Sequence, residues 1–145
     1  MKKKEEKKLS KYISEIEYIC RHCKAYPPDF TLIPGSPYSM LFDIFDSLRE
    51  KWGKPILISS GYRCQAHNAK IGGAPLSIHL FGLALDLMFK NIEERIKFQA
   101  LVEKEYPELR RGTYKDRPHI LHIDVGYLIY PRATDKWTQG VEWIT

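Results

Sequence analysis

The 145-residue chain lacks any long run of apolar residues. No stretch approaches the roughly 20 apolar residues that a membrane-spanning helix needs, so we expect no membrane insertion. The charged amino terminus, residues 1–8, is not followed by the apolar segment of a secretory signal peptide, and we expect the protein to be cytoplasmic as made. Cysteine is scarce as well. An odd count of three, without an export signal, argues against a disulfide framework.

The formal net charge of +5 is distributed unevenly, because five of the basic residues lie within the first eight positions. A positive charge suits an anionic partner such as nucleic acid or a bacterial wall polymer. No motif for nucleic-acid binding accompanies it, and we expect no such partner. A chain of this length with 43% hydrophobic residues can bury a core of its own. We therefore expect a charged flexible tail over residues 1–8, one domain over residues 9–145, and a monomer.

The apolar residues follow patterns typical of a mixed fold. Helical spacing and capping residues predict helices over residues 9–20, between a cap at Ser36 or Ser39 and Gly53, and from Asn91 to about Tyr106. Short apolar runs predict strands at residues 55–59, 83–87, 120–125 and 127–130. The proline-rich stretch at residues 26–37 must be loop, and a polar, glycine-rich connection follows the first strand. This order predicts an α+β domain with a small, mostly antiparallel sheet and about three helices.

A histidine and an aspartate stand seven residues apart in an otherwise apolar segment. Gly82 between them allows a sharp turn, so that His79 in a loop can fold over the strand that carries Asp86. A buried aspartate in an apolar strand is unfavourable unless it is paired or bound to a cation. Catalytic zinc sites usually have three protein ligands from histidine, aspartate, glutamate or cysteine, and they leave a fourth position for water.

A second pattern of this kind occurs in the strand at residues 120–125. His122 and Asp124 share one face of that strand, and a carboxylate in this place can orient an imidazole or the surrounding loop. Ordinary hydrogen-bonded polar residues would give the same patterns, and spacing alone leaves both interpretations open.

The full set of sequence motifs in the central region is more informative than the spacing of the histidines and aspartates. Its matching elements are Ser59-Ser60-Gly61-Tyr62-Arg63, Asn68, Gly72-Gly73-Ala74, Ser77-x-His79-x-x-Gly82-x-Ala84-x-Asp86 and His122-x-Asp124. Over about residues 36–126 the sequence, through these motifs, resembles the zinc D-Ala-D-Ala carboxypeptidase family. That family includes D-Ala-D-Ala dipeptidases and phage L-alanyl-D-glutamate endolysins, and the hedgehog signalling domain is a structural relative. The resemblance implies a hedgehog-like fold.

The resemblance also implies roles for individual residues. One zinc ion per chain would be held by His79, Asp86 and His122. Arg63 would stabilise the substrate carbonyl or carboxylate during attack, and Ser77 would contact substrate. A salt bridge that anchors its loop is the alternative role for Arg63.

One position departs from the family pattern. Several branches place a glutamate or aspartate three residues before the last zinc histidine, as general base and acid. Here that position is His119, and the nearest preceding acid is Asp116. Histidine can relay protons near neutral pH, so His119 is our candidate base. If His119 is only a surface residue, Asp116 or a residue elsewhere moves the proton.

The resemblance predicts a zinc metallopeptidase that hydrolyses peptidoglycan stem peptides, as a D,D-carboxypeptidase or an endopeptidase. The short chain and the basic balance suit a phage endolysin that degrades the cell wall after release from the cytoplasm. The alternative is a zinc-stabilised binding module of the same fold without turnover, which the missing acid before His122 keeps open.

The cysteines form an incomplete pattern. Cys20-Arg21-His22-Cys23 has the spacing of half a zinc knuckle, but no second pair completes it. Cys64 and His67 could contribute in principle. We interpret the three thiols as structural or inert rather than as a second metal site.

Overall fold

The computed structural model describes residues 6–74, 77–129, 140 and 142–145. Its centre is a five-stranded sheet in the order β1-β2-β4-β3-β5. The strands are β1 (Leu57–Ser60), β2 (Ala84–Met88), β3 (Arg110–Thr113), β4 (Ile120–Asp124) and β5 (Glu142–Ile144). Neighbouring strands are antiparallel, except that β3 and β5 are parallel. The predicted α+β class with a mostly antiparallel sheet is confirmed.

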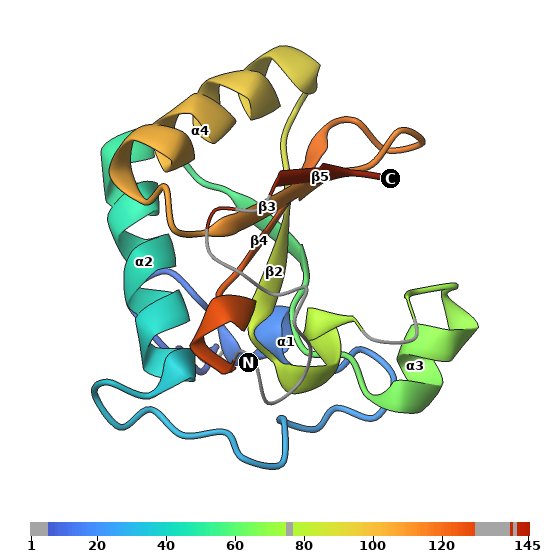
Figure 1. Cartoon of the computed structure of the whole chain (residues 1–145). Coiled ribbons are helices and arrows are strands. Elements are labelled where there is room, and N and C mark those ends of the chain that lie inside the picture. Colours follow the sequence, from blue (N-terminus) through green and yellow to red (C-terminus); the bar gives the residue numbers. More distant parts are fainter. Residues whose placement is uncertain (1–5, 75–76, 130–139, 141) are drawn as a thin grey trace, which may run out of the picture.

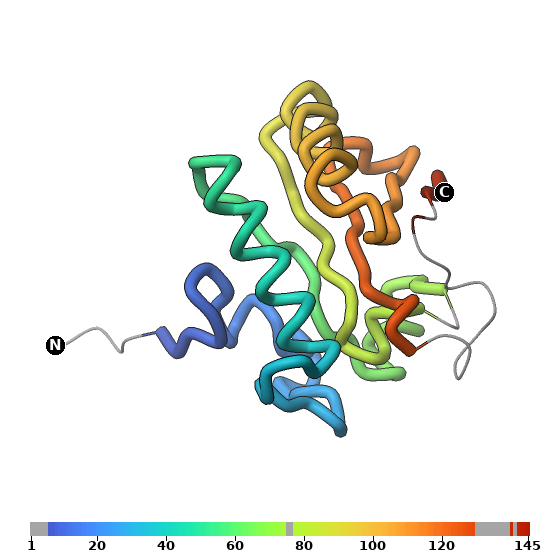
Figure 2. Tube along the Cα trace, turned by 60° about the vertical axis from the view of Figure 1, so that its left-hand side comes forward, coloured from blue at the N-terminus to red at the C-terminus, as the bar shows by residue number. Residues whose placement is uncertain are grey.

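Four α-helices and two short 3-10 helices accompany the sheet. They are α1 (Glu15–Tyr18), α2 (Pro37–Trp52), α3 (Gln65–Lys70), α4 (Ile92–Glu105), η1 (Ile78–Phe81) and η2 (Gly126–Ile129). Helix α2 lies along one side of the sheet and contacts α4, whereas α3 lies at the opposite side of the molecule (Figures 1 and 2). Within the described residues, no helix has the length and apolar character to cross a membrane.

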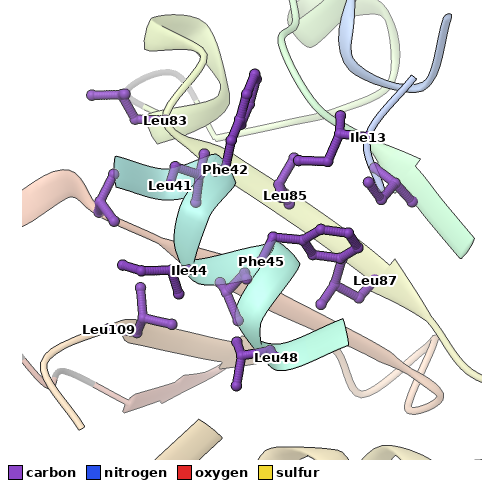
Figure 3. Packing of buried hydrophobic residues seen from close by; sticks show 14 of the residues in the cluster. Ile13, Leu41, Phe42, Ile44, Phe45, Leu48, Leu83, Leu85, Leu87 and Leu109 are labelled. Carbon is purple, nitrogen blue, oxygen red and sulfur yellow. The ribbon is translucent and has the colours of Figure 1, made fainter. Parts of the chain in front are cut away.

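Helix α2 is defined by local signals at both ends and supplies much of the core. The Ser36 hydroxyl accepts a hydrogen bond from the Ser39 backbone N–H at 3.1 Å, and Gly53 ends the helix at φ 79°. Its buried residues face Leu85 and Leu87 of β2 (Figure 3). The buried residues of α2 are Tyr38, Leu41, Phe42, Ile44, Phe45 and Leu48. This packing on one face of β2 leaves the other face, which carries Asp86, for the site.

The predicted helix over residues 9–20 is wrong except for one short turn. Only Glu15–Tyr18 is helical, and Ile16 of the expected apolar face is 57% exposed. The Asp46 carboxylate accepts hydrogen bonds from the Ser10 hydroxyl and from two backbone N–H groups of the next residues, and so holds this segment as a loop. Of the expected tail, residues 1–5 lie outside the described residues, and Lys8 forms a β-bridge with Ser14.

The predicted strand at residues 127–130 is also wrong. Gly126–Ile129 forms η2, in which the Leu128 N–H donates to the Val125 carbonyl at 2.9 Å, while residue 130 lies outside the described residues. The sequence patterns did not predict β3, β5, η1 or α3. Helix α3 occupies the connection that we expected to be irregular.

Candidate metal centre

Three of the predicted site residues converge on one point. His79 comes from η1, Asp86 from β2 and His122 from β4, and one ligand atom from each lies within 4.8 Å of the others. Asp86 Oδ1 lies 3.2 Å from His79 Nε2 and 3.1 Å from His122 Nδ1. All three side chains are buried.

Backbone geometry explains why these residues meet. Asp86 and His122 are direct cross-strand partners in the β2–β4 ladder. Gly82 ends η1 at φ 72° and turns the chain into β2, as the sequence suggested. A Cβ at Gly82 would lie 2.2 Å from Pro27 Cγ and 2.4 Å from the Tyr18 hydroxyl oxygen. The turn that brings His79 over Asp86 therefore requires glycine at this position.

The hydrogen bonds of the two imidazoles decide which nitrogens are free. His79 Nδ1 lies 2.7 Å from the Gly61 carbonyl oxygen, which can only accept, so Nδ1 carries the proton. His79 Nε2 is then left with a lone pair, and it has no hydrogen-bond partner. His122 Nε2 donates to Asp124 Oδ2 at 2.6 Å, so Nδ1 is the nitrogen that faces Asp86 Oδ1, at 3.1 Å.

These contacts point proton-free atoms at one another. His79 Nε2 and Asp86 Oδ1 face each other at 3.2 Å without a proton between them, which is unfavourable in a buried site. A divalent cation bound by all three atoms removes that conflict, and two nitrogens with one oxygen are a normal ligand set for zinc. The buried group of His79, Asp86 and His122 is therefore consistent with a zinc site.

The close contacts within this group shift the pKa values of all three side chains. Burial raises the pKa of Asp86, but the nearby His79 and His122 outweigh it and bring the pKa well below the usual range. Burial lowers the pKa of His79. Burial also acts to lower the pKa of His122, yet the hydrogen bonds with Asp124 and Asp86 prevail and raise it to about 9. In the metal-free protein a proton on His122 therefore takes the place of the cation.

Asp124 is held rigidly behind His122. It is fully buried and accepts hydrogen bonds from Arg110 Nε at 3.0 Å and from the Gly126 N–H at 2.9 Å. These bonds aim its second oxygen at the His122 ring, the orienting place that the sequence suggested for Asp124. Arg110, its cross-strand neighbour in β3, was missed because β3 shows no strand pattern.

The Trp143 indole packs beside the His122 ring. Its ring centroid lies 4.9 Å from that of His122. A Cβ at Gly112, which pairs with Trp143 in the β3–β5 ladder, would lie 2.0 Å from the indole ring. The missing side chain at position 112 thus makes room for the indole beside a metal ligand.

The metal centre lies in a cleft of about 1010 Å³. Tyr114 and Asp116 line it together with the metal group, Arg63 and Ser77. The Tyr114 hydroxyl donates to Asp86 Oδ1 at 3.0 Å, and burial raises the pKa of Tyr114, so it stays protonated. Sequence patterns gave no signal for Tyr114, whose place depends on the course of the chain after β3.

Arg63 is buried in the cleft wall and only partly satisfied. One of its terminal nitrogens donates to the Ser77 hydroxyl at 3.3 Å, and its Nε has no hydrogen-bond partner. No acid among the described residues forms an ion pair with Arg63, so the alternative of a loop-anchoring salt bridge finds no partner there. The guanidinium is available to an anionic or carbonyl group in the cleft.

His119 is the predicted site residue that the structure does not bring to this group. It is half-buried just before β4 and is not among the described residues that line the cleft. Its carbonyl accepts from the Phe89 N–H at 3.0 Å, and strand alternation sets positions 119 and 122 on opposite faces. Asp116, the other residue considered for the proton transfer, lines the cleft with a side chain that is 79% exposed.

Two comparisons with known proteins bear on the family of this chain. A search of curated proteins gave no match. A model of the family described as Peptidase M15 matches residues 14–124, which is most of the chain, and the protein therefore belongs to the Peptidase M15 family.

Proposed function

We propose that the protein is a zinc-dependent peptidase that hydrolyses peptidoglycan stem peptides. M15 peptidases use zinc and act on peptidoglycan peptides. The observation that carries the proposal is the convergence of three metal-ligand atoms, on His79, Asp86 and His122, at a cleft of substrate size. Zinc in such a site lowers the pKa of a bound water to about 7 and polarises the scissile carbonyl.

Arg63 supplies the binding group for substrate charge. Its guanidinium lies in the cleft beside Ser77 with an unpaired Nε, so it can hold a substrate carboxylate or the oxyanion that develops during attack. The Ser77 hydroxyl orients the guanidinium and is itself within reach of a ligand in the cleft. This arrangement suits a peptide with a free carboxylate near the scissile bond as well as an internal bond.

Asp116 is the better placed residue for proton transfer. It lies in the cleft and is accessible to solvent, whereas His119 lies outside it. An Asp116→Asn variant should lose peptidase activity while His119→Ala retains it. The reverse result would return the role to His119.

The biological setting follows from the substrate. We propose an endolysin-like enzyme, made in the cytoplasm, monomeric, and acting on the cell wall after release. Both a D,D-carboxypeptidase and an endopeptidase fit the site.

A second function, a zinc-stabilised binding module without turnover, is favoured by one observation. No acid stands three residues before His122, and the histidine found there is outside the cleft. Such a protein would bind zinc and wall peptides without cleaving them.

The decisive experiment is digestion of purified peptidoglycan and defined stem peptides by the zinc-loaded protein, followed by mass spectrometry of the muropeptides. We expect new amino termini that depend on zinc and disappear in Asp86→Ala and His122→Ala. Asp43→Ala, which alters an exposed acid on α2, is the matched control and should cleave normally. Stoichiometric zinc with no cleavage across a broad panel of peptides would refute the peptidase and support the binding module.

A further inference from the structure

Three thiols that the cleft does not use lie together. Cys20 and Cys23 follow α1, and Cys64 precedes α3, yet their sulfur atoms lie within 4.8 Å of one another. In a tetrahedral zinc site two sulfurs are about 3.8 Å apart, given Zn–S bonds of about 2.3 Å. The cluster therefore needs only a small contraction to hold an ion.

The chain around Cys20 and Cys23 is folded so that both sulfurs reach one point. The Lys24 N–H donates to the Cys20 carbonyl at 2.9 Å, and the Cys20 N–H donates to the Ala25 carbonyl at 3.1 Å. Lys24 adopts φ 58°, and it is the one non-glycine residue at positive φ in the part of the chain that the structure describes. A tight turn of this kind matches a Cys-x-x-Cys metal-binding loop.

The sulfurs receive backbone hydrogen bonds of the type that supports thiolates. The Cys64 N–H donates to Cys20 Sγ at 3.4 Å, and the His67 N–H donates to Cys64 Sγ at 3.4 Å.

A histidine lies beside the cluster. His22 Nδ1 lies 3.7 Å from Cys64 Sγ, close to the edge of about 3.5 Å that a tetrahedron with one Zn–S and one Zn–N bond requires. The His67 ring stacks on His22 with centroids 6.2 Å apart. His22 is exposed and can turn toward the sulfurs with little rearrangement.

We propose that Cys20, Cys23 and Cys64 bind a second zinc ion as thiolates, with His22 as the fourth ligand. Binding releases the three thiol protons to solvent, and four protein ligands leave no position for a reacting water, so the site is structural. The thiols would then be metal ligands and not inert, and this role does not depend on the peptidase function.

The position of the site suggests what it stabilises. Cys64 directly follows Arg63, the Tyr62 N–H donates to the Tyr18 carbonyl at 2.7 Å, and the Arg63 N–H donates to the His79 carbonyl at 3.0 Å. An ion that joins Cys64 to the loop after α1 therefore fixes the segment that carries the cleft arginine beside the catalytic metal group.

Cobalt substitution in the fully reduced, full-length protein tests the proposal. Only a thiolate site gives a sulfur-to-cobalt charge-transfer band in the near ultraviolet. We expect two cobalt ions per chain and a band that persists in His122→Ala but disappears in Cys23→Ser. Cys23 is exposed, so its substitution should leave the fold intact, which circular dichroism would verify. A wild-type protein that binds one ion and shows no charge-transfer band would overturn the proposal.

Two further measurements test the ligand set. His22→Ala should weaken cobalt binding at the thiolate site, whereas His67→Ala should not; the opposite result would overturn the assignment of His22. In zinc-saturated wild-type protein, all three thiols should resist alkylation until a chelator is added. Rapid alkylation in the presence of zinc, or an intact mass showing that two thiols had joined as a disulfide under reducing conditions, would overturn the site itself.

Discussion

At the scale of single residues, His122 depends on Asp124 for both its orientation and its tautomer. Asp124 Oδ2 accepts a hydrogen bond from His122 Nε2, and this bond makes Nδ1 the nitrogen that can bind a metal beside Asp86. Asp124→Asn removes the charge and the ion pair with Arg110. We expect zinc affinity at this site to fall about 10- to 100-fold, the usual loss for a partner of a metal-bound histidine.

Chelator competition with zinc measures this effect, in a Cys23→Ser background that removes the thiolate site. Asp116→Asn is the matched control, because its carboxylate lines the cleft without contacting His122 and its loss should leave zinc affinity unchanged. Equal zinc affinity in wild type and Asp124→Asn would show that Asp124 does not orient the ligand.

The proton on His122 predicts opposite pH dependences for stability and zinc binding. The folded, metal-free protein holds this proton up to a pKa of about 9, above the roughly 6.5 of an unfolded histidine. A raised pKa stabilises the fold fully below about pH 6.5, and that stabilisation is lost as pH rises toward 9. Because zinc must displace the same proton, zinc affinity should rise over this window.

Urea unfolding of the chelated protein at several pH values, together with zinc titrations, checks both trends. His122→Ala should abolish the His122 part of the stability trend. A metal-free protein whose stability rises between pH 6.5 and 9 would contradict the protonation state described here.

At the scale of elements, the sequence predicts those structures whose signals are local. Helix α2 carries its own cap at Ser36 and its own stop at Gly53, and β2 and β4 are continuous apolar runs interrupted by metal ligands. Strand β3 could not be predicted in this way. It begins Arg110-Arg111-Gly112, and these residues are buried only because β4 and β5 flank them.

The same distinction separates the predicted site residues from the missed ones. His79, Asp86 and His122 stand out as polar residues in apolar segments. Tyr114 and Trp143 reach the centre through the course of the chain and the strand register, which no local pattern encodes.

The segment before α1 shows how a distant partner overrides helical periodicity. Asp46 on α2 accepts hydrogen bonds from the Ser10 hydroxyl and from the N–H groups of Lys11 and Tyr12. Asp46→Ala leaves these donors unpaired. We expect a loss of about 1–3 kcal/mol in the free energy of unfolding, measured with urea. Asp43→Ala on the exposed face of the same helix is the control and should change stability by less than about 0.5 kcal/mol. Equal losses in both variants would mean that Asp46 does not hold the loop.

At the scale of the whole molecule, the family implies a hedgehog-like fold. In this chain one face of the sheet packs in the core and the other face carries the metal site. One face packs its leucines against α2 (Figure 3), and the other carries the row of Asp86, His122, Gly112 and Trp143 across four paired strands. Asp86 and His122 are thus mounted on paired central strands, which keep them in place before zinc arrives. The exception is His79, whose position depends on η1 and on the loop after β1.

That dependence couples the two proposed metal sites. The Gly61 carbonyl accepts from His79 Nδ1 at 2.7 Å, and only two residues separate Gly61 from Cys64. Loss of the structural ion should loosen this loop and lower zinc affinity at the His79 site by about tenfold, within the usual range of coupling between sites. Coupling is reciprocal, so His122→Ala should weaken the thiolate site by the same factor. Titrations of Cys23→Ser and His122→Ala against wild type measure both directions, with His67→Ala as the control that alters no ligand. Unchanged affinities in both directions would show that the two sites act independently.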